Sequence, residues 1–302
     1  MPELPEVEIT RQKLINEKLI GAKIAGFWSD WPRGVQIAKS PSAINHDIKG
    51  RKIVGLRRVG KALFFDLGGK PFDKTPLYGD RGSREQGKVQ RVLGWHFRMS
   101  GRLLVRRSFN GGASEGGEAG EKSIHVRVAL ADGREIAFRD PRKFGVVWYG
   151  ISEELARDPY IGTLGPDMLS VKFPEFKRQL QSKNGMIKPV LLDQKNVAGI
   201  GNIIVDESLW HARIHPQKQL YKFYDREIIK IFKSLKFVIN RILKARGSTM
   251  RDWSHPDGEV GGYEKIRWVY GRAGENCPRC GNIIKRIVVG GRGTSVCLKC
   301  QK

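Results

Sequence analysis

The positions of the four cysteines constrain the fold of this chain more than any other feature. All four lie in the last 26 of its 302 residues, in the pattern C-x2-C-x16-C-x2-C, as Cys277, Cys280, Cys297 and Cys300. Two C-x2-C pairs can present four thiolates to one tetrahedral ion, and this spacing is typical of zinc sites in cytosolic proteins. A redox pair, or two unrelated pairs, would leave the matched spacing unexplained. We therefore expect one structural zinc ion (Zn2+) and a small module folded around it.

The charge balance predicts a polyanionic partner. The chain carries 55 Lys and Arg against 31 Asp and Glu, a formal net charge of +24, and 40% of its residues are hydrophobic. A folded domain of this charge favours nucleic acid as partner, with an anionic membrane surface as the second candidate. The apolar runs are shorter than the ~20 residues of a membrane span, and the acidic start "PELPEVE" differs from a signal segment. We expect a cytoplasmic protein without a membrane partner.

Hydrophobic periodicity divides the chain into a β part followed by a helical part. Residues 5–21 predict a helix with Pro5 in its first turn and Gly21 as its stop. From Ile24 to Tyr149 apolar residues alternate, and "HVRVALADGREIAF" predicts a hairpin that turns at Asp132-Gly133. Several such short strands predict a β-sandwich or a barrel-like domain.

The helical part begins after "DPYIGTLGPDML", which is typical of a linker. Residues 173–183 place Phe173, Phe176 and Leu180 on one face of a helix, and residues 226–247 predict a long helix ending at Gly247. The expected fold is α+β and multi-domain. Its parts are an N-terminal β-sandwich domain with a leading helix over 1–160, a linker over 161–170, a helical domain over 171–268 and a zinc module over 269–302.

Two glycine-rich segments are suited to phosphate contacts. In "QKNVAGIGNIIVDESLW" two glycines precede Asn202 and an apolar helix, and the N–H groups of a helix start can bind phosphate. A plain interhelical turn with a cap explains the same residues. Between the cysteine pairs, "IIKRIVVGGRGTSVC" predicts two strands whose tip holds Arg292. Such a hairpin can present Arg292 to a phosphate or a groove, or it can be a structural knob with a solvated arginine.

Two other segments resemble surface probes, and each has an ordinary alternative. "FRDPRKFGVVWYG" places Arg142, Lys143 and Phe144 directly after a strand. An exposed Phe beside basic residues suits insertion into a base stack, whereas a Phe in a turn is more commonly part of a core. Met99 precedes Ser100-Gly101 in "HFRMSGRLL", and an isolated Met is usually core filler.

The start of the chain holds a candidate nucleophile. Removal of Met1 exposes the secondary amine of Pro2, which can attack an electrophilic sugar carbon and form an iminium. Glu3 can transfer protons beside it, and Glu6 follows one helical turn later. The alternative is an ordinary helix N-terminus, with acids placed favourably on the helix dipole.

Taken together, these segments resemble the formamidopyrimidine-DNA glycosylase family of bacterial base-excision repair enzymes. The resemblance spans nearly the whole chain, in "PELPEVE", "RRVGKALFFDL", "FRMSGRL", "RDPRKFG", "TLGPD", "NVAGIGNIIVDE", "GSTMRDW", "VYGRAGENCPRCG" and "GGRGTSVCLKCQ". Each motif is modest alone, and their order together is specific. The related endonuclease VIII branch typically begins "PEGPE", whereas this chain has Leu4. "GSTMRDW" followed by "DGEVGGY" resembles the loop that covers the flipped base in the formamidopyrimidine branch.

The resemblance implies a bifunctional glycosylase and abasic-site lyase acting on oxidised purines in duplex DNA, chiefly 8-oxoguanine and formamidopyrimidines. It implies that Pro2 attacks C1′ as the base leaves, that Glu3 transfers protons and that Glu6 supports them. β- and δ-elimination then follow from the Schiff base. It implies a closed, structural zinc site. In this family a damaged nucleotide is turned out of the stack.

The remaining residue roles also come from the resemblance. Met99, Arg142 and Phe144 would fill the gap left by the flipped nucleotide, with Arg142 on the orphaned base, usually cytosine, and Phe144 as a wedge. Lys61 would contact the phosphate beside the lesion. Asn202, in a helix–two-turn–helix motif, and Arg292, on the zinc hairpin, would clamp phosphates. The expected partner is damaged double-stranded DNA, bound by a monomer.

The sequence also departs from the family pattern, and other functions stay open. The segments near 68–90 and 109–122 look inserted and enlarged. An oxidised-pyrimidine glycosylase of the endonuclease VIII type is one alternative. A non-catalytic zinc-ribbon DNA-binding protein is another, and it accounts for the charge and the cysteines but gives no role to Pro2 and Glu3.

Overall fold

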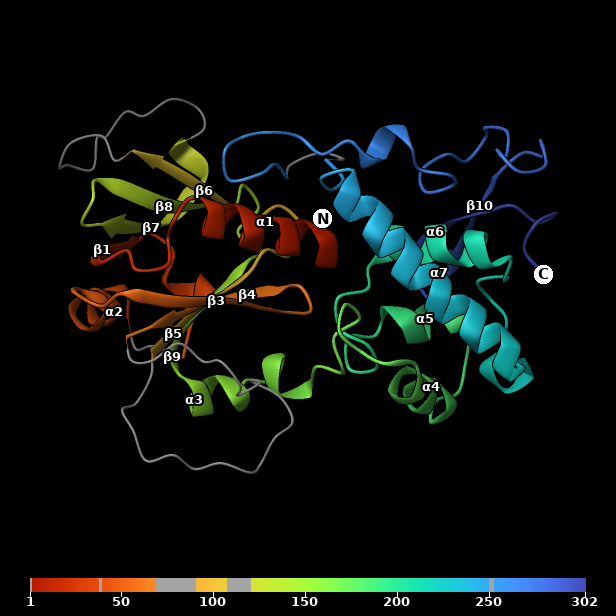
Figure 1. The fold of residues 1–302 in the computed structure, drawn as a ribbon, viewed down its shortest axis with the longest axis horizontal. Helices are drawn as coiled ribbons and strands as arrows, with labels where there is room; N and C mark the ends of the chain where they lie inside the picture. The colour runs from red at the N-terminus through yellow and green to blue at the C-terminus, as the bar shows by residue number, and fades with distance from the viewer. Residues whose placement is uncertain (1, 38–39, 69–90, 108–120, 250–252) are drawn as a thin grey trace. The chain divides into compact units, whose positions relative to one another are not determined.

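The computed structural model describes residues 2–37, 40–68, 91–107, 121–249 and 253–302 (Figure 1). The chain forms two compact units that interleave along the sequence. The first unit contains Pro2, Glu6–Gly162 and Thr249–Gly261, and the second contains Glu3–Pro5, Thr163–Ser248 and Gly262–Lys302. The backbone therefore passes between the units several times.

The described residues of the first unit form two β-sheets (Figure 1). One sheet has the order β1-β7-β8-β6, formed by β1 (Ile24–Ser29), β7 (Ile124–Leu130), β8 (Arg134–Arg139) and β6 (Arg102–Arg107). The other has the order β2-β9-β5-β4-β3, formed by β2 (Val35–Gln36), β9 (Val146–Ile151), β5 (Arg91–His96), β4 (Ala62–Leu67) and β3 (Ile53–Val59). All pairings are antiparallel except that of β2 with β9.

One hydrophobic core joins the two sheets and confirms the predicted β-sandwich. It contains Phe27 and Phe138 from one sheet and Phe65 and Trp95 from the other, all buried. Helices α1 (Leu4–Asn16) and α2 (Pro41–Ile48) add residues such as Leu14 to this core. Strand β4 is buried along its whole length, because a second cluster covers the outer face of its sheet. This double burial explains why every residue of β4 except Asp66 is apolar.

The first helix ends earlier than the predicted stop at Gly21. Helix α1 stops at Asn16, because Lys18 adopts a left-handed conformation with φ +56°. The N–H of Leu19 then reaches back to the carbonyl of Leu14 at 3.3 Å, and Leu19 is fully buried. This geometry is that of a Schellman cap, with Lys in the position that Gly usually takes. The gain from burying Leu19 explains why the chain turns before Gly21.

The hairpin predicted around Asp132-Gly133 is confirmed. Strands β7 and β8 pair antiparallel across this turn, and Gly133 has φ +82°, a conformation that favours glycine. The Arg134 N–H donates to Asp132 Oδ1 at 3.1 Å. Short helices complete the described connections: α3 (Ser152–Ala156) and the 3-10 turns η1 (Pro32–Gly34), η2 (Glu121–Ser123), η3 (Ile161–Thr163), η4 (Leu220–Lys222) and η5 (Tyr263–Lys265).

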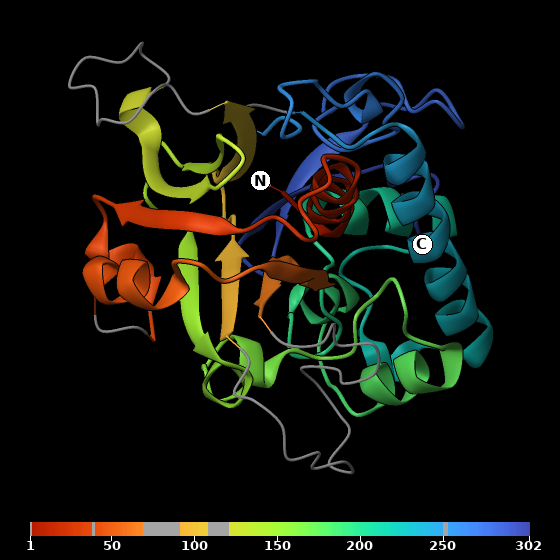
Figure 2. The same ribbon diagram turned by 60° about the vertical axis from the view of Figure 1, so that its left-hand side comes forward.

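The second unit is built on four helices, α4 (Phe173–Gln181), α5 (Ile187–Leu192), α6 (Asn202–Ala212) and α7 (Asp225–Lys244). The long helix α7 is the teal helix in Figure 2. As predicted, α4 buries one apolar face: the rings of Phe173 and Phe176 lie 5.5 and 5.2 Å from that of Phe232 on α7. The chain leaves α7 through Gly247, with φ +85°.

The last part of the second unit is a two-stranded hairpin, as predicted. Strands β10 (Lys285–Val289) and β11 (Arg292–Val296) pair antiparallel, with Val289 opposite Arg292. Gly290 and Gly291 form the turn with φ +56° and +71°, which a two-residue turn of this kind requires. Arg292 is therefore the first strand residue after the tip. No described helix combines the length and apolar sequence that crossing a membrane requires.

Candidate active site and zinc site

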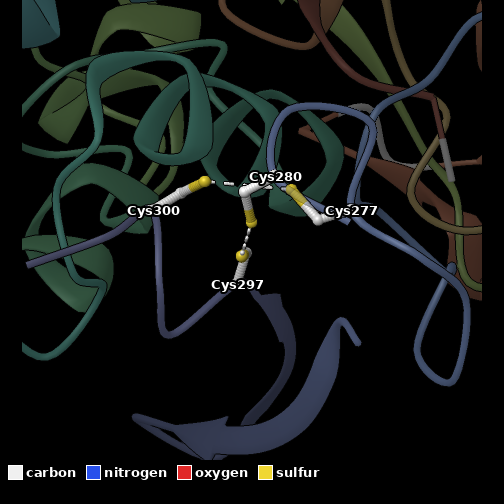
Figure 3. Close-up of side chains that lie close together, drawn as sticks. All are labelled: Cys277, Cys280, Cys297 and Cys300. Carbon is white, nitrogen blue, oxygen red and sulfur yellow. Dashed lines mark hydrogen bonds between the residues drawn. The ribbon is translucent and has the colours of Figure 1, made fainter. Parts of the chain in front are cut away.

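The four cysteines lie together at the base of the hairpin (Figure 3). Their sulfur atoms all lie within 4.8 Å of one another. Cys280 Sγ is 3.5 Å from Cys297 Sγ, and Cys277 Sγ is 3.9 Å from Cys300 Sγ. Sulfurs around a tetrahedral zinc ion, each bonded at ~2.3 Å, lie about 3.8 Å apart, whereas a disulfide needs ~2.05 Å. The four side chains therefore fit one zinc ion.

The surroundings of the cysteines also favour a metal ion. Although burial raises the pKa of the Cys277 thiol, the N–H groups of Arg279 and Cys280 and the Trp210 indole lower it to about 6. Burial and the neighbouring thiols raise the pKa of Cys300 to about 12. The complete set of thiolates therefore needs a cation between them. Four thiolates leave no open coordination position, so the zinc is structural.

Glu3 is held at the N-terminus of α6. Its Oε1 accepts the N–H of Ile203 at 2.9 Å, and its Oε2 accepts the N–H of Ile204 at 3.1 Å. These N–H groups belong to the first turn of α6, where no carbonyl of the helix can accept them. The carboxylate also lies at the positive end of the helix dipole. The sequence suggested that the N–H groups at this helix start bind a phosphate. In the structure, those of Ile203 and Ile204 bind the carboxylate of Glu3, which is 2% exposed.

The two glycines before α6 make room for the N-terminal segment. A Cβ atom on Gly201 would lie 2.1 Å from Cδ of Glu3. A Cβ atom on Gly199 would lie 2.5 Å from Cδ1 of Leu4, and Gly199 has φ +99°. The Leu4 N–H donates to the Gly199 carbonyl at 3.1 Å. The glycine-rich turn therefore serves to seat Glu3 and Leu4, which fixes the direction in which the chain reaches Pro2.

The tip of the zinc hairpin is attached to the same helix. Asn202 Nδ2 donates to the Gly293 carbonyl at 3.0 Å. Buried Lys188 donates to Asp206 Oδ1 at 2.5 Å and to Thr294 Oγ1 at 2.8 Å. The second unit therefore brings together the predicted residues Glu3 and Asn202 with the strand that begins at Arg292, whose side chain is exposed.

In the first unit, Lys61 and Glu6 hold defined positions. Lys61 follows Gly60, with φ +57°, in the tight turn between β3 and β4, and its side chain is 7% exposed. Glu6 lies in the first turn of α1 and is 2% exposed. Glu6 lies eight residues, or just over two helical turns, before the buried Leu14, so both side chains are on the covered side of α1.

The three predicted probe residues lie on two neighbouring loops of the sandwich. Met99 lies between β5 and β6, and Arg142 and Phe144 lie between β8 and β9. Met99 is 45% exposed and Phe144 is 54% exposed, and Arg142 is exposed as well. The alternative of two core residues, which the sequence left open, is therefore wrong for Met99 and Phe144.

The comparisons with known proteins agree along the whole chain. The formamidopyrimidine-DNA glycosylase N-terminal domain matches residues 1–147, the formamidopyrimidine-DNA glycosylase H2TH domain matches 164–254, and the zinc finger found in FPG and IleRS matches 274–302. A formamidopyrimidine-DNA glycosylase from Geobacillus kaustophilus is 35% identical over 100% of both chains. This chain belongs to the formamidopyrimidine-DNA glycosylase family. The Bacillus subtilis family member is 33% identical over 100% of this chain and 99% of its own.

Solved structures of the family have the same fold. A complex of Lactococcus lactis Fpg with DNA containing an abasic site matches with a TM-score of 0.81 and 30% identity, over 100% of both chains. A complex of the wild-type Lactococcus lactis protein with DNA containing N7-benzyl-Fapy-dG gives the same TM-score and identity, again over 100% of both chains. The expected α+β architecture of sandwich, helical domain and zinc hairpin is confirmed.

Sequence reasoning missed the buried ionic groups that hold this family member's second unit together. Burial lowers the pKa of Lys188 and raises that of Asp206 to about 6, although the two groups attract each other. Next to Asp206, the Glu207 carboxylate accepts the N–H groups of Trp268, Val269 and Tyr270 at 2.8–3.1 Å. A charged residue inside an apolar run, as in "GMIKPVLL", is the signal that identifies Lys188.

Glu8 in the first unit was also missed. Although burial raises the pKa of this carboxyl, the guanidinium groups of Arg11 and Arg58 hold it below its usual value. Arg58 Nε donates to Glu8 Oε2 at 3.0 Å, and both side chains are nearly covered. This pair ties α1 to β3 beside the start of the chain. The inserted segments near 68–90 and 109–122 lie mostly outside the described residues, as does Met1.

Proposed function

We propose that this chain is a bifunctional DNA glycosylase and abasic-site lyase that removes oxidised purines from duplex DNA. Its membership of a family of DNA glycosylases, over its full length, makes it an enzyme of this class. The related Lactococcus lactis structures contain DNA with abasic sites and with Fapy-dG lesions. The Fapy-dG lesion supports formamidopyrimidines as substrates of this chain, and we propose 8-oxoguanine as a second substrate.

The seating of Glu3 is the observation that carries this proposal. A nucleophile at the end of a chain is useful only if that end is held in place, since free chain ends are normally poorly ordered. Here both oxygens of Glu3 are bonded to the start of α6, and the Leu4 backbone is bonded to Gly199. The amine of Pro2 is therefore one residue away from a carboxylate of fixed orientation. A DNA-binding module without catalysis needs no such arrangement.

The first step uses the amine that removal of Met1 exposes. The lone pair of the Pro2 nitrogen attacks C1′, and the glycosidic bond breaks with its electrons leaving on the damaged base. Loss of the amine proton and opening of the sugar ring give an iminium between Pro2 and C1′. Glu3 protonates the ring oxygen in this step and later accepts a proton. The hydrogen bonds from Ile203 and Ile204 orient the carboxylate for both transfers.

The iminium then allows the strand to be cut. It acidifies the proton on C2′, and loss of that proton expels the 3′ phosphate by β-elimination. δ-Elimination next expels the 5′ phosphate. Hydrolysis of the remaining imine releases the sugar fragment and restores the free Pro2 amine. Neither step needs a metal, and the zinc ion contributes by holding the hairpin.

We assign the DNA contacts to residues of the hairpin tip, the start of α6, the β3–β4 turn and the two loops that carry Met99 and Phe144. Arg292, on the hairpin tip, and Asn202, at the start of α6, are suited to phosphates, and Lys61 to the phosphate beside the lesion. Met99, Arg142 and Phe144 are suited to filling the space that the flipped nucleotide leaves. The net charge of +24 supports a large electrostatic share of this affinity.

Borohydride trapping tests the proposed chemistry. The purified full chain, with its N-terminus checked by mass spectrometry, is incubated with a duplex containing 8-oxoguanine opposite cytosine. Reduction should leave a covalent protein–DNA adduct on the Pro2 nitrogen. Pro2→Gly should form sharply less adduct, because a primary amine in a flexible residue is held less well. No adduct from protein whose Met1 has been removed would refute the lyase.

A lesion panel decides between purine and pyrimidine substrates. The alternative of an oxidised-pyrimidine glycosylase keeps some support, because wild-type Lactococcus lactis Fpg has also been solved with DNA containing an oxidised pyrimidine. Duplexes with 8-oxoguanine, formamidopyrimidine and an oxidised pyrimidine are compared under single-turnover conditions. Faster excision of the pyrimidine than of both purines would contradict the proposed substrate class.

Four further expectations belong to this proposal. The chain acts as a monomer, in the cytoplasm, without a membrane partner. Its functional divisions are the domain over 1–160, the linker over 161–170, the helical domain over 171–268 and the zinc module over 269–302. Sedimentation of the free protein and of its complex with a lesion duplex tests the monomer.

A further inference from the structure

We infer that Asp140 is a positioning residue that couples the two probe loops, so that they enter the DNA stack as one unit. The probe loops are residues 97–101, which carry Met99, and residues 140–145, which carry Arg142 and Phe144. This inference rests on the proposed function, because it assigns a role within the same DNA contact.

The Asp140 side chain bonds to both probe loops. It is 0% exposed, although Met99 and Phe144 on the two loops are exposed. Its Oδ1 accepts the hydroxyl of Ser100, the residue after Met99. Its Oδ2 accepts the N–H of Gly145 at 2.7 Å, and Oδ1 accepts a longer bond, 3.4 Å, from the N–H of Arg142. One carboxylate thus fixes the residue after Met99 and the backbone on both sides of Phe144.

The probe loops also share a hydrophobic support. The ring of Phe138, two residues before Asp140, is fully buried under both of them. A Cβ atom on Gly101 would lie 2.7 Å from Cζ of this ring, and one on Gly145 would lie 2.6 Å from the same atom. The two glycines let the backbones of both loops close on one ring. A shift of one loop therefore disturbs the surface on which the other packs.

Each probe loop holds its probe on a strained backbone. Arg98, directly before Met99, has φ +48°, and Lys143, directly before Phe144, has φ +52°. A residue with a side chain in this region is held there by its surroundings at a cost in stability. The Arg98 N–H is held by His96 Nδ1 at 2.9 Å, and the Lys143 N–H by the Asp140 carbonyl at 3.0 Å. Asp140 thus acts through both its side chain and its backbone.

Two loops that fill the space left by one flipped nucleotide must move together. The space left by one flipped nucleotide has a fixed size, and probes from two loops reach it from two points of the chain. If the loops moved independently, each insertion would order a separate loop at its own entropic cost. The shared carboxylate lowers that cost, because the loops are ordered before DNA arrives. Asp140 itself touches neither the substrate nor the reacting atoms.

Asp140→Asn tests the coupling, because the amide keeps the size of the side chain and cannot accept at both of its ends. Two reactions are measured in single turnover: excision of 8-oxoguanine from a duplex, and β-elimination at an abasic site in a single strand. The single-stranded substrate has no duplex stack, so no probe residue has to fill a gap in it. We expect excision to fall about tenfold, the scale of a lost positioning contact, with a much smaller change in elimination.

A fluorescent readout separates positioning from folding. 2-Aminopurine beside the lesion brightens when the stack opens, and the amplitude of this change should fall in Asp140→Asn. Ser100→Ala removes only the link to the Met99 loop and should show a smaller loss. The double variant should be no worse than Asp140→Asn alone, because both changes break the same contact. Asp132→Asn, in the β7–β8 turn, is the matched control and should behave as wild type.

The outcomes distinguish this inference from the proposed function. A wild-type protein without a trapped adduct would refute the function itself. An active wild type with an unchanged excision-to-elimination ratio in Asp140→Asn would overturn the coupling alone. Equal losses in both reactions, or additive losses in the double variant, would assign Asp140 a purely structural role and also overturn it.

Discussion

Gly201 has no room for a side chain, and the reason is the residue that it faces. Glu3 lies so close that a methyl group at Gly201 would overlap its carboxylate. Gly201→Ala should therefore displace Glu3 from the start of α6 and slow adduct formation about 100-fold, since a displacement of ~1 Å can cost this much. Single-turnover trapping measures the effect.

The control for this variant is Gly262→Ala in the same unit. A Cβ atom there would meet only the Ala245 carbonyl, at 3.4 Å. It should form adduct at the wild-type rate. If Gly201→Ala formed adduct as fast as Gly262→Ala, the position of Glu3 at the start of α6 would be irrelevant to catalysis.

Glu8 should contribute stability that depends on pH. Although burial raises its pKa, Arg11 and Arg58 hold that pKa below the ordinary value of 4.5. A carboxyl whose pKa is lower in the folded state stabilises the protein above pH 4.5, and this contribution is lost as the pH falls through the folded-state pKa. Glu8→Gln should lower the free energy of unfolding by about 2 kcal/mol near pH 7, with a smaller deficit near pH 3.

Urea unfolding at several pH values measures this difference. The matched control is Glu153→Gln, whose carboxylate is exposed on α3. The free energy of unfolding of Glu153→Gln should be only slightly below that of the wild type, by an amount that does not change with pH. A Glu8→Gln deficit that grows as the pH falls would contradict the assigned ion pairs.

Single residues also show the limits of sequence reasoning. The motifs suggested Glu3, Met99 and Phe144 as functional residues, but periodicity cannot tell an exposed Phe from a buried one. The exposure of Met99 and Phe144 depends on the packing of both loop backbones on Phe138, which is a tertiary effect. Lys188 and Glu207 were missed for the opposite reason. Charged residues usually face water, so only the folded structure reveals a buried charge with its partners.

At the scale of elements, the zinc hairpin should depend on its metal. Cys277 and Cys297 pack with Trp210 in a small cluster, and the Trp210 indole donates to Cys277 Sγ at 3.4 Å. So small a core is insufficient without an ion. Chelation should release one zinc ion per chain, shift tryptophan emission to the red and abolish binding to a lesion duplex. Added Zn2+, but not Mg2+, should reverse all three changes.

The outcome that would contradict this prediction is equally specific. Complete metal release with unchanged tryptophan emission and unchanged amide protection of β10 and β11 would show that the hairpin folds without zinc.

Element boundaries were predicted well where turn chemistry is local. The turns at Asp132-Gly133 and Gly290-Gly291 follow from their dipeptides, because few residues adopt their backbone angles. The end of α1 was not predictable in this way. Lys18 adopts a left-handed angle only because the buried position of Leu19 compensates for it, and no local signal encodes that compensation.

At the scale of the whole molecule, the sequence predicted the order of β part, helical part and zinc module. It did not predict that the compact units interleave. The described residues of the range 249–261 follow the helical segment in sequence and pack within the first unit, where Lys13 pairs with Asp257 and Glu259. These contacts join positions more than 240 residues apart. Such pairings lie beyond the reach of periodicity and motif spacing.

This interleaving restricts how the gene can be divided. The backbone changes unit after Pro2, Pro5, Gly162, Ser248 and Gly261. Cleavage of the backbone after Gly162 would give two fragments that do not coincide with the two units. The first fragment would still contain Glu3–Pro5 of the second unit, and the second fragment would still contain Thr249–Gly261 of the first unit. A split-protein reporter or a recombination event that divides the chain at this point would not produce two fragments that each contain one complete unit. We therefore expect a chain divided after Gly162 to fold less completely than the intact chain.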